Sequence, residues 1–143
     1  MIRRCPHCGR KNRVPAARLA DRGRCGACGQ ALEPAAEPLD VTAAEHDEIA
    51  GAARVPVLID FWAAWCGPCR AAAPEVARAA ASTSGRALVL KVDTEKEPEL
   101  AARYGVRNIP NFVVLKDGQV VGQHAGVVGH DTLVAWLEQA ARR

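Results

Sequence analysis

One stretch decides the fold of this 143-residue chain, Asp60-Phe61-Trp62-Ala63-Ala64-Trp65-Cys66-Gly67-Pro68-Cys69-Arg70. An apolar run, residues 55–59, leads into it, and an alanine-rich helical pattern leaves it, so the two cysteines are predicted to lie where a strand passes into a helix. The first N–H groups of a helix have no partner and its dipole favours negative charge, so a thiolate at Cys66 is stabilised there. Cys69, one helical turn further on and expected to be more buried, can close a disulfide with it. The pattern therefore predicts a dithiol/disulfide couple.

Two more C-x-x-C pairs stand near the N-terminus, in the pattern C-x2-C-x16-C-x2-C. This spacing is typical of tetrahedral zinc sites. The predicted ligands are Cys5, Cys8, Cys25 and Cys28. A site filled by four thiolates has no open position, so the zinc is predicted to be structural. The alternative is a pair of disulfides, which a reducing compartment disfavours. His7, inside the first pair, is expected to face solvent.

Charge is distributed unevenly along the chain. Residues 1–30 hold eight Lys or Arg and one acidic residue, whereas the remaining residues hold 11 basic and 15 acidic ones. The sequence therefore implies two modules whose net charges have opposite signs. A basic zinc module could bind nucleic acid, but residues 1–30 contain no aromatic side chain for stacking on bases. We therefore do not expect a nucleic-acid partner.

The chain is predicted to consist of a zinc-ribbon-like module (1–29), a linker (30–40) with two prolines, and a second domain (41–143). Thr42 and Glu45 form a capping box for a helix over 43–53. Strands are expected over 55–61, 87–92, 111–115 and 120–124, the last two joined by a hairpin turn. Helices are expected after Cys69, over 97–104 and over 131–142.

The motif Trp65-Cys66-Gly67-Pro68-Cys69-Arg70, after an Asp-Phe-Trp strand end, resembles the active-site motif of the thioredoxins. The order of predicted elements from residue 55 onward is similar to the thioredoxin fold, an α/β fold with a mixed central sheet flanked by helices. With the cysteine pairs in front, the whole chain resembles the zinc-binding thioredoxins of bacteria (thioredoxin 2 type). The extra first strand that many thioredoxins have is left unassigned.

The resemblance implies roles for particular residues. Cys66 would be the nucleophile, Cys69 the resolving thiol, Asp60 a buried general acid/base, and Lys91 its supporting neighbour. Pro110 would be the cis-proline of a loop beside the cysteines, followed by Asn111 where the family usually has Thr. The expected substrate groove consists of Trp65, Gly67, Pro68, Ile109 and Gly126. The alternative, a third zinc knuckle at Cys66 and Cys69, lacks two further ligands nearby.

The implied activity is that of a protein-disulfide reductase in electron transport, recharged by a flavin-containing thioredoxin reductase that uses NADPH. The chain has no dinucleotide-binding fingerprint, so no bound flavin or NAD(P) is expected. Without an apolar run long enough to span a membrane or a signal-peptide core, the default compartment is the cytoplasm. A monomer is expected. Two rival functions remain open: a redox sensor regulated through its zinc, and a nucleic-acid-binding module with a thioredoxin scaffold.

Overall fold

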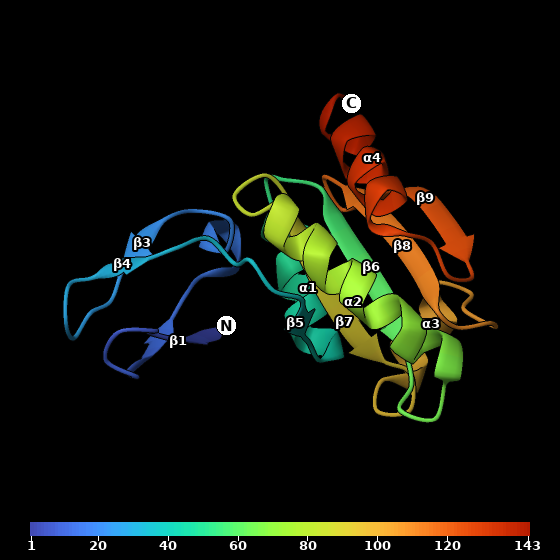
Figure 1. Cartoon of the computed structure of the whole chain (residues 1–143), viewed down its shortest axis with the longest axis horizontal. Coiled ribbons are helices and arrows are strands. Elements are labelled where there is room, and N and C mark those ends of the chain that lie inside the picture. Colours follow the sequence, from blue (N-terminus) through green and yellow to red (C-terminus); the bar gives the residue numbers. More distant parts are fainter.

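The computed structural model describes residues 1–143 and consists of an N-terminal ribbon followed by a larger α/β body (Figure 1). In the ribbon, β1 (Ile2–Arg4) pairs with β2 (Lys11–Arg13), and β3 (Gly23–Arg24) pairs with β4 (Ala31–Leu32). A 3-10 turn, η1 (Ala16–Arg18), lies between the two hairpins. The body contains β5 (Leu39–Asp40), α1 (Ala43–Ala52), β6 (Val57–Trp62), α2 (Gly67–Ser82), β7 (Leu88–Asp93), α3 (Pro98–Arg103), β8 (Asn111–Lys116), β9 (Gln119–Ala125) and α4 (His130–Ala141).

The body is a five-stranded mixed sheet in the order β5-β7-β6-β8-β9. Strands β5, β7 and β6 are parallel, while β8 and β9 run antiparallel to their neighbours. Helices α1 and α3 pack on one face, with Ile49 and Leu100 in the core, and α2 and α4 pack on the other, with Val76 and Leu133. The predicted fold class, a mixed sheet flanked by helices, is confirmed.

The central strand β6 explains why the body folds around the stretch identified in the sequence. Its side chains alternate between the two cores: Val57, Ile59 and Phe61 belong to the core under α1 and α3, and Leu58 to the core under α2 and α4. Asp60 therefore points to the α2 side of the sheet, where it is 2% exposed. A single carboxylate is buried at the end of an otherwise apolar strand.

The local signals in the sequence explain the element boundaries. The Thr42 side chain accepts from the Glu45 N–H at 3.2 Å, and the Glu45 carboxylate accepts from the Thr42 N–H at 3.0 Å, so the predicted capping box is present. The hairpin between β8 and β9 turns at Asp117 and Gly118, both with positive φ. The extra first strand of many thioredoxins is present as β5, two residues that pair with Leu90 and Lys91 of β7.

The ribbon does not hang free of the body. Leu19, directly after η1, is fully buried in the same core as Ile49 of α1, and Val14 and Ala16 pack against that core. The hydroxyl of Ser84, just after α2, donates to the Pro34 carbonyl at 3.2 Å. This bond holds the segment just after the ribbon at the C-terminal end of α2, and Figure 1 shows the ribbon beside that end.

Both ends of the segment expected as a linker, residues 30–40, are in strands. Residues 31–32 form β4 of the ribbon, and residues 39–40 form β5 of the body. Between them, the Ala35 N–H donates to the Leu19 carbonyl at 3.0 Å, and Ala35 is buried. The connecting segment is therefore residues 33–38, and it is held at Pro34, through Ser84, and at the buried Ala35. No helix in the structure combines the length and the apolar character needed to cross a bilayer.

Replacing Leu19 by alanine is expected to destabilise the whole protein. Removing a fully buried leucine side chain costs about 2–5 kcal/mol, and here the lost contacts join the ribbon to the body. Urea unfolding followed by tryptophan fluorescence reports on the body, because all three tryptophans lie there. The matched control is Ile2→Ala in the same ribbon, a side chain that is 52% exposed and should matter little. Equal stability of the two variants would contradict the docking.

Candidate functional site

The two cysteines of the motif lie where β6 ends and α2 begins. Cys66 is the N-cap of α2, and its Sγ accepts a hydrogen bond from the Cys69 N–H at 3.1 Å. Gly67 and Pro68 form the first turn, where proline is favoured because its missing N–H would have no partner in any case. The fold thus places the Cys66 sulfur at the positive end of a 16-residue helix, as the sequence predicts.

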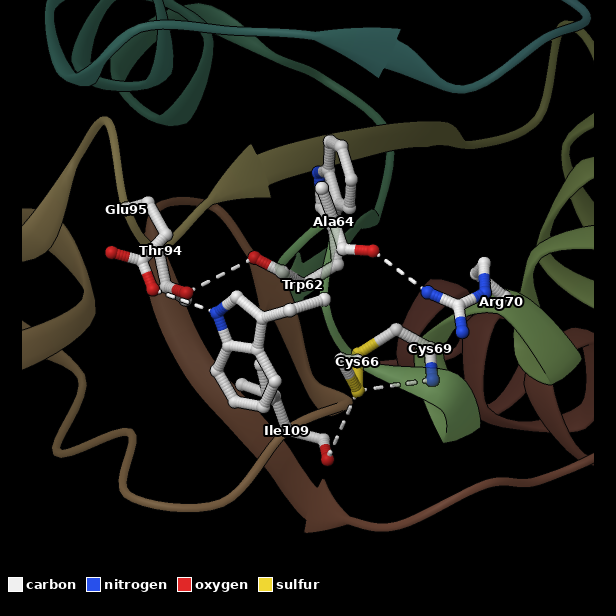
Figure 2. Close-up of a disulfide and its surroundings, with 9 residues drawn as sticks. Trp62, Ala64, Cys66, Cys69, Arg70, Thr94, Glu95 and Ile109 are labelled. Atoms are coloured by element: carbon white, nitrogen blue, oxygen red, sulfur yellow. Dashed lines mark hydrogen bonds between the residues drawn. A yellow bond between two sulfur atoms is a disulfide. The ribbon is translucent and has the colours of Figure 1, made fainter.

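Cys66 and Cys69 are joined by a disulfide, with their Cα atoms 5.3 Å apart (Figure 2). Their exposures are 3% and 5%, so the expectation that Cys69 is the more buried of the two was wrong for this oxidised form. Cys66 is covered because Ile109 and Trp62 pack against the pair, and its Sγ lies 3.7 Å from the Ile109 carbonyl oxygen. In this form the disulfide is therefore covered by apolar side chains.

Asp60, on the strand that leads to this pair, is buried on the side of the sheet that α2 covers. Burial raises the pKa of its carboxyl from 3.8 to about 7, while the positive charge of Lys91 acts to lower it. Lys91 is the register partner of Asp60 on β7, and its ammonium lies 4.4 Å from the centre of the Trp62 ring. Neither Oδ1 of Asp60 nor Nε1 of Trp62 has a hydrogen-bond partner in the protein. The site thus contains a carboxyl that exchanges its proton near neutral pH.

Replacing Asp60 by asparagine is expected to stabilise the oxidised protein in a pH-dependent way. The folded-state pKa of about 7 lies above the unfolded value, so the unfolded chain releases the proton first and stability falls as pH rises from about 4 to about 7. At pH values above that range, a difference of about three pKa units lowers the free energy of unfolding by about 4 kcal/mol. Asp60→Asn should therefore raise the free energy of unfolding at about pH 8 by several kcal/mol and change it little at about pH 4.

Urea unfolding at a series of pH values measures this difference. The exposed Asp40→Asn is the matched control and should show no such gain. A gain for Asp60→Asn that is the same at all pH values would contradict the elevated pKa.

The loop before β8 faces the disulfide from the other side. The Ile109–Pro110 peptide bond is cis, and the Pro110 carbonyl accepts from the Gly126 N–H at 2.9 Å. Gly126 has φ of +109°, which a residue with a side chain rarely adopts. Asn111 is buried, and its side-chain oxygen accepts from Gln123 Nε2 at 3.1 Å, which gives this residue a local hydrogen-bond partner. The bond between Pro110 and Gly126 thus holds these two residues together, next to Ile109.

Two residues without a role predicted from the sequence, Glu95 and Arg70, hold the loop between β6 and α2. The Trp65 indole, 67% exposed, donates to the Glu95 carboxylate at 2.7 Å. Arg70 Nη1 donates to the Ala64 carbonyl at 2.8 Å (Figure 2). A signal for Glu95 was present: it follows β7, and the carboxyl ends of parallel strands meet at one edge of a sheet. No comparable pattern pointed to Arg70.

The four N-terminal cysteines form a second cluster, in the ribbon. Their sulfur atoms all lie within 4.8 Å of one another, at 3.7 Å for Cys5 and Cys28 and at 3.6 Å for Cys8 and Cys25. All four are free thiols, so the alternative of two disulfides is not found. His7 is exposed and is not part of the cluster, as expected.

The cluster has the size and surroundings of a zinc site. Four sulfurs around zinc with bonds of about 2.3 Å lie about 3.8 Å apart. The knuckles are alike: the N–H groups of His7 and Ala27 each point at the first sulfur of their pair at 3.4 Å. Gly9 and Gly29 close both turns with positive φ. Asn12 Nδ2 adds a contact to the Cys25 sulfur at 3.5 Å. The residues present fit zinc, which would cross-link the two hairpins when bound.

A C-x-x-C disulfide at a helix N-terminus, a buried carboxyl with pKa near neutrality, and a cis-proline loop over the pair define a thiol-disulfide oxidoreductase. The particular family follows from comparison with known proteins. The profile of the Thioredoxin family matches residues 37–139, and that described as "Thioredoxin 2, N-terminal" matches residues 4–30. The chain belongs to the thioredoxin family, with the zinc ribbon of thioredoxin 2 at its N-terminus.

Individual relatives agree with this assignment. Thioredoxin C-3 of Corynebacterium nephridii is 40% identical over 139 residues, which cover 97% of this chain and 94% of that protein. Thioredoxin 1 of a Nostoc strain is 47% identical over 85 residues, 59% of this chain and 79% of that one. Among solved structures, a mutant thioredoxin from Halobacterium salinarum has a TM-score of 0.68 and 37% identity, covering 73% of this chain and 91% of that one. The chain is thus a protein-disulfide oxidoreductase that acts through the Cys66/Cys69 dithiol couple.

Proposed function

We propose that Cys66 is the attacking thiol and Cys69 the resolving one. The Cys66 thiolate attacks one sulfur of a client disulfide, forming a mixed disulfide and releasing the other client sulfur as a thiolate, which takes up a proton. The Cys69 thiol then loses its proton and attacks Cys66 Sγ, which releases the second client sulfur. Two electrons pass to the client, and Cys66–Cys69 is left oxidised. The position of Cys66 as N-cap of α2, with the Cys69 N–H on its sulfur, is the observation that carries this assignment.

Asp60 is proposed to take the proton that Cys69 loses and to return it in the reverse reaction. A general base works best when its pKa lies close to the working pH, and burial brings Asp60 to about 7. Lys91 is a positioning residue in this scheme, since its charge opposes the effect of burial on the Asp60 carboxyl. Client backbone and side chains are expected to meet Trp65, Gly67, Pro68, Ile109, Pro110 and Gly126 around the disulfide.

The remaining assignments concern the setting of the reaction. A thioredoxin reductase using NADPH is the proposed electron donor, and disulfide-containing proteins are the proposed acceptors. The protein is proposed to work in electron transport as a cytoplasmic monomer. It is proposed to bind no flavin or NAD(P) of its own. Zinc is proposed to be bound by Cys5, Cys8, Cys25 and Cys28 in a structural role. We also propose two modules, the ribbon and the thioredoxin domain, joined through residues 33–38.

Reduction of insulin disulfides tests the proposal directly. The protein, a thioredoxin reductase and NADPH are mixed with insulin, and NADPH oxidation and the precipitation of the freed insulin B chain are followed together. Activity that needs all three components supports the proposed electron path. NADPH consumption without insulin reduction would contradict it.

Removing the carboxylate that holds Trp65 is expected to weaken client binding and to leave the rate of the disulfide-exchange steps nearly unchanged. Glu95→Ala leaves the exposed indole without its 2.7 Å partner, so KM for insulin should rise about two- to fivefold, as for loss of one exposed hydrogen bond, with kcat little changed. Glu95→Gln keeps an acceptor oxygen and should behave like the unmodified protein. Initial rates over a range of insulin concentrations separate the two parameters. If Glu95→Ala matched Glu95→Gln in KM, the indole contact would have no role in docking.

A further inference from the structure

The surface of the ribbon carries a cavity of about 280 Å³ that is open to solvent and that none of the zinc-cluster cysteines lines. Five of the residues that line it are arginines, contributed by β1, β2, η1, the turn after η1 and β3: Arg3, Arg13, Arg18, Arg22 and Arg24. The only acidic residue in the lining is Asp21. Segments distant in sequence therefore gather positive charge around one hollow.

Two of the five arginines are paired with acidic side chains of the protein. Arg3 donates to the Glu33 carbonyl at 2.7 Å and lies 3.8 Å from the Glu37 carboxylate, and Arg22 pairs with the Glu33 carboxylate at 3.1 Å. The other three arginines of the lining take part in no ion pair. Guanidinium groups gathered without anions repel one another, so a bound anion would relieve an unfavourable arrangement.

The chemistry of the lining indicates which anion fits. Guanidinium groups bind phosphate through paired, charge-assisted hydrogen bonds. Residues 1–60 contain no Phe, Trp or Tyr, so the ribbon offers no platform on which bases could stack. A concave site favours a compact ligand over an extended one. We propose that this cavity binds a compact polyphosphate anion of two or three linked phosphate groups.

The site is separate from the redox reaction. The ribbon meets the body through Leu19 in the core under α1, and Pro34, just after the ribbon, bonds to Ser84 beyond the C-terminal end of α2, whereas Cys66 caps the N-terminus of that helix. A helix of this length spans about 24 Å. Binding at the cavity should therefore leave insulin reduction unchanged, and the two functions can be tested apart.

Titration calorimetry with sodium tripolyphosphate and the full-length, zinc-loaded protein tests the proposal. One saturable site that weakens with added salt is expected. The double variant Arg18→Gln, Arg24→Gln should bind at least about tenfold more weakly, because two charge-assisted contacts are lost. The matched control Arg10→Gln, Lys11→Gln removes the same charge from the ribbon outside the cavity and should stay within about twofold. Zinc content and insulin reduction should be normal in both.

Three results would overturn the proposal. One is the absence of saturable binding, and another is an equal loss in the two double variants, which would mean attraction by net charge alone. The third is binding of single-stranded oligothymidylates that is tighter than that of tripolyphosphate and strengthens with length, which would indicate a nucleic-acid surface. If the cavity double variant loses zinc, the single variants Arg13→Gln and Arg18→Gln provide the same comparison with Arg10→Gln.

Discussion

Replacement of Cys66 by serine is expected to abolish insulin reduction, with a fall of at least about 10³-fold in turnover. A serine hydroxyl stays protonated at neutral pH and cannot form a disulfide, so the first exchange step has no nucleophile. The substitution changes one atom in a cluster of Cys66, Cys69 and Ala63, and it should leave the fold and the zinc content intact. The coupled assay with NADPH and thioredoxin reductase measures the loss.

Cys69→Ser is the matched comparison, because it removes the other sulfur of the same disulfide. It should also stop turnover, but it should accumulate a mixed disulfide between Cys66 and the client, which mass spectrometry of the unreduced peptides identifies. Retention of turnover by Cys66→Ser, or capture of client through Cys69 in its place, would reverse the proposed roles.

Loss of zinc is expected to unfold the ribbon and to destabilise the body while leaving the redox chemistry in place. Structural zinc bound by thiolates contributes about 10–16 kcal/mol to the folding of small modules, and a ribbon this short cannot build a sufficient core alone. With the ribbon unfolded, Leu19 leaves the shared core and the body loses about 2–5 kcal/mol. Cys25→Ser or a strong chelator should produce this state, with zinc content and urea unfolding as the measurements.

His7→Ala is the control for this experiment, since His7 lies between two ligands and is exposed. It should keep one zinc per chain. Under conditions in which the body of the zinc-free protein is still folded, its rate of insulin reduction should stay within about twofold of that of the zinc-loaded protein. The reason is that Cys66 lies at the far end of α2 from the ribbon. Zinc loss in His7→Ala would contradict the four-cysteine site. Loss of activity in a folded body would favour the rival account, in which zinc regulates the redox site.

The sequence predicted the body well where its signals are local. The capping box at Thr42, the hairpin turn at Asp117 and Gly118, and the strand-to-helix junction at Cys66 each depend on neighbouring residues, and all three are present. Strand β5 escaped prediction because its two residues become a strand only through pairing with β7, some fifty positions away. A pairing of this kind leaves no periodic pattern in so short a segment.

Tertiary contacts explain the other differences between the structure and the expectations from the sequence. The sequence predicts a ribbon joined by a linker, since no pattern around Leu19 indicates that its side chain enters the core of α1 and β7. The near-equal burial of Cys66 and Cys69 comes from Ile109, which reaches the pair from a loop over forty residues away. Likewise, Arg70 reaches back to the Ala64 carbonyl through a rotamer that no sequence pattern specifies.

The pKa of the Cys66 thiol tests most directly whether the start of α2 activates this sulfur. The fully reduced protein is treated with iodoacetamide at a series of pH values, and the alkylation rate at each cysteine is read by peptide mass spectrometry. Thioredoxins as a family have an attacking thiol with a pKa of about 7, and the rate at Cys66 is expected to rise with a midpoint near that value. A midpoint of about 8.5 or above, that of a cysteine in a free peptide, would show that the start of α2 does not activate this sulfur.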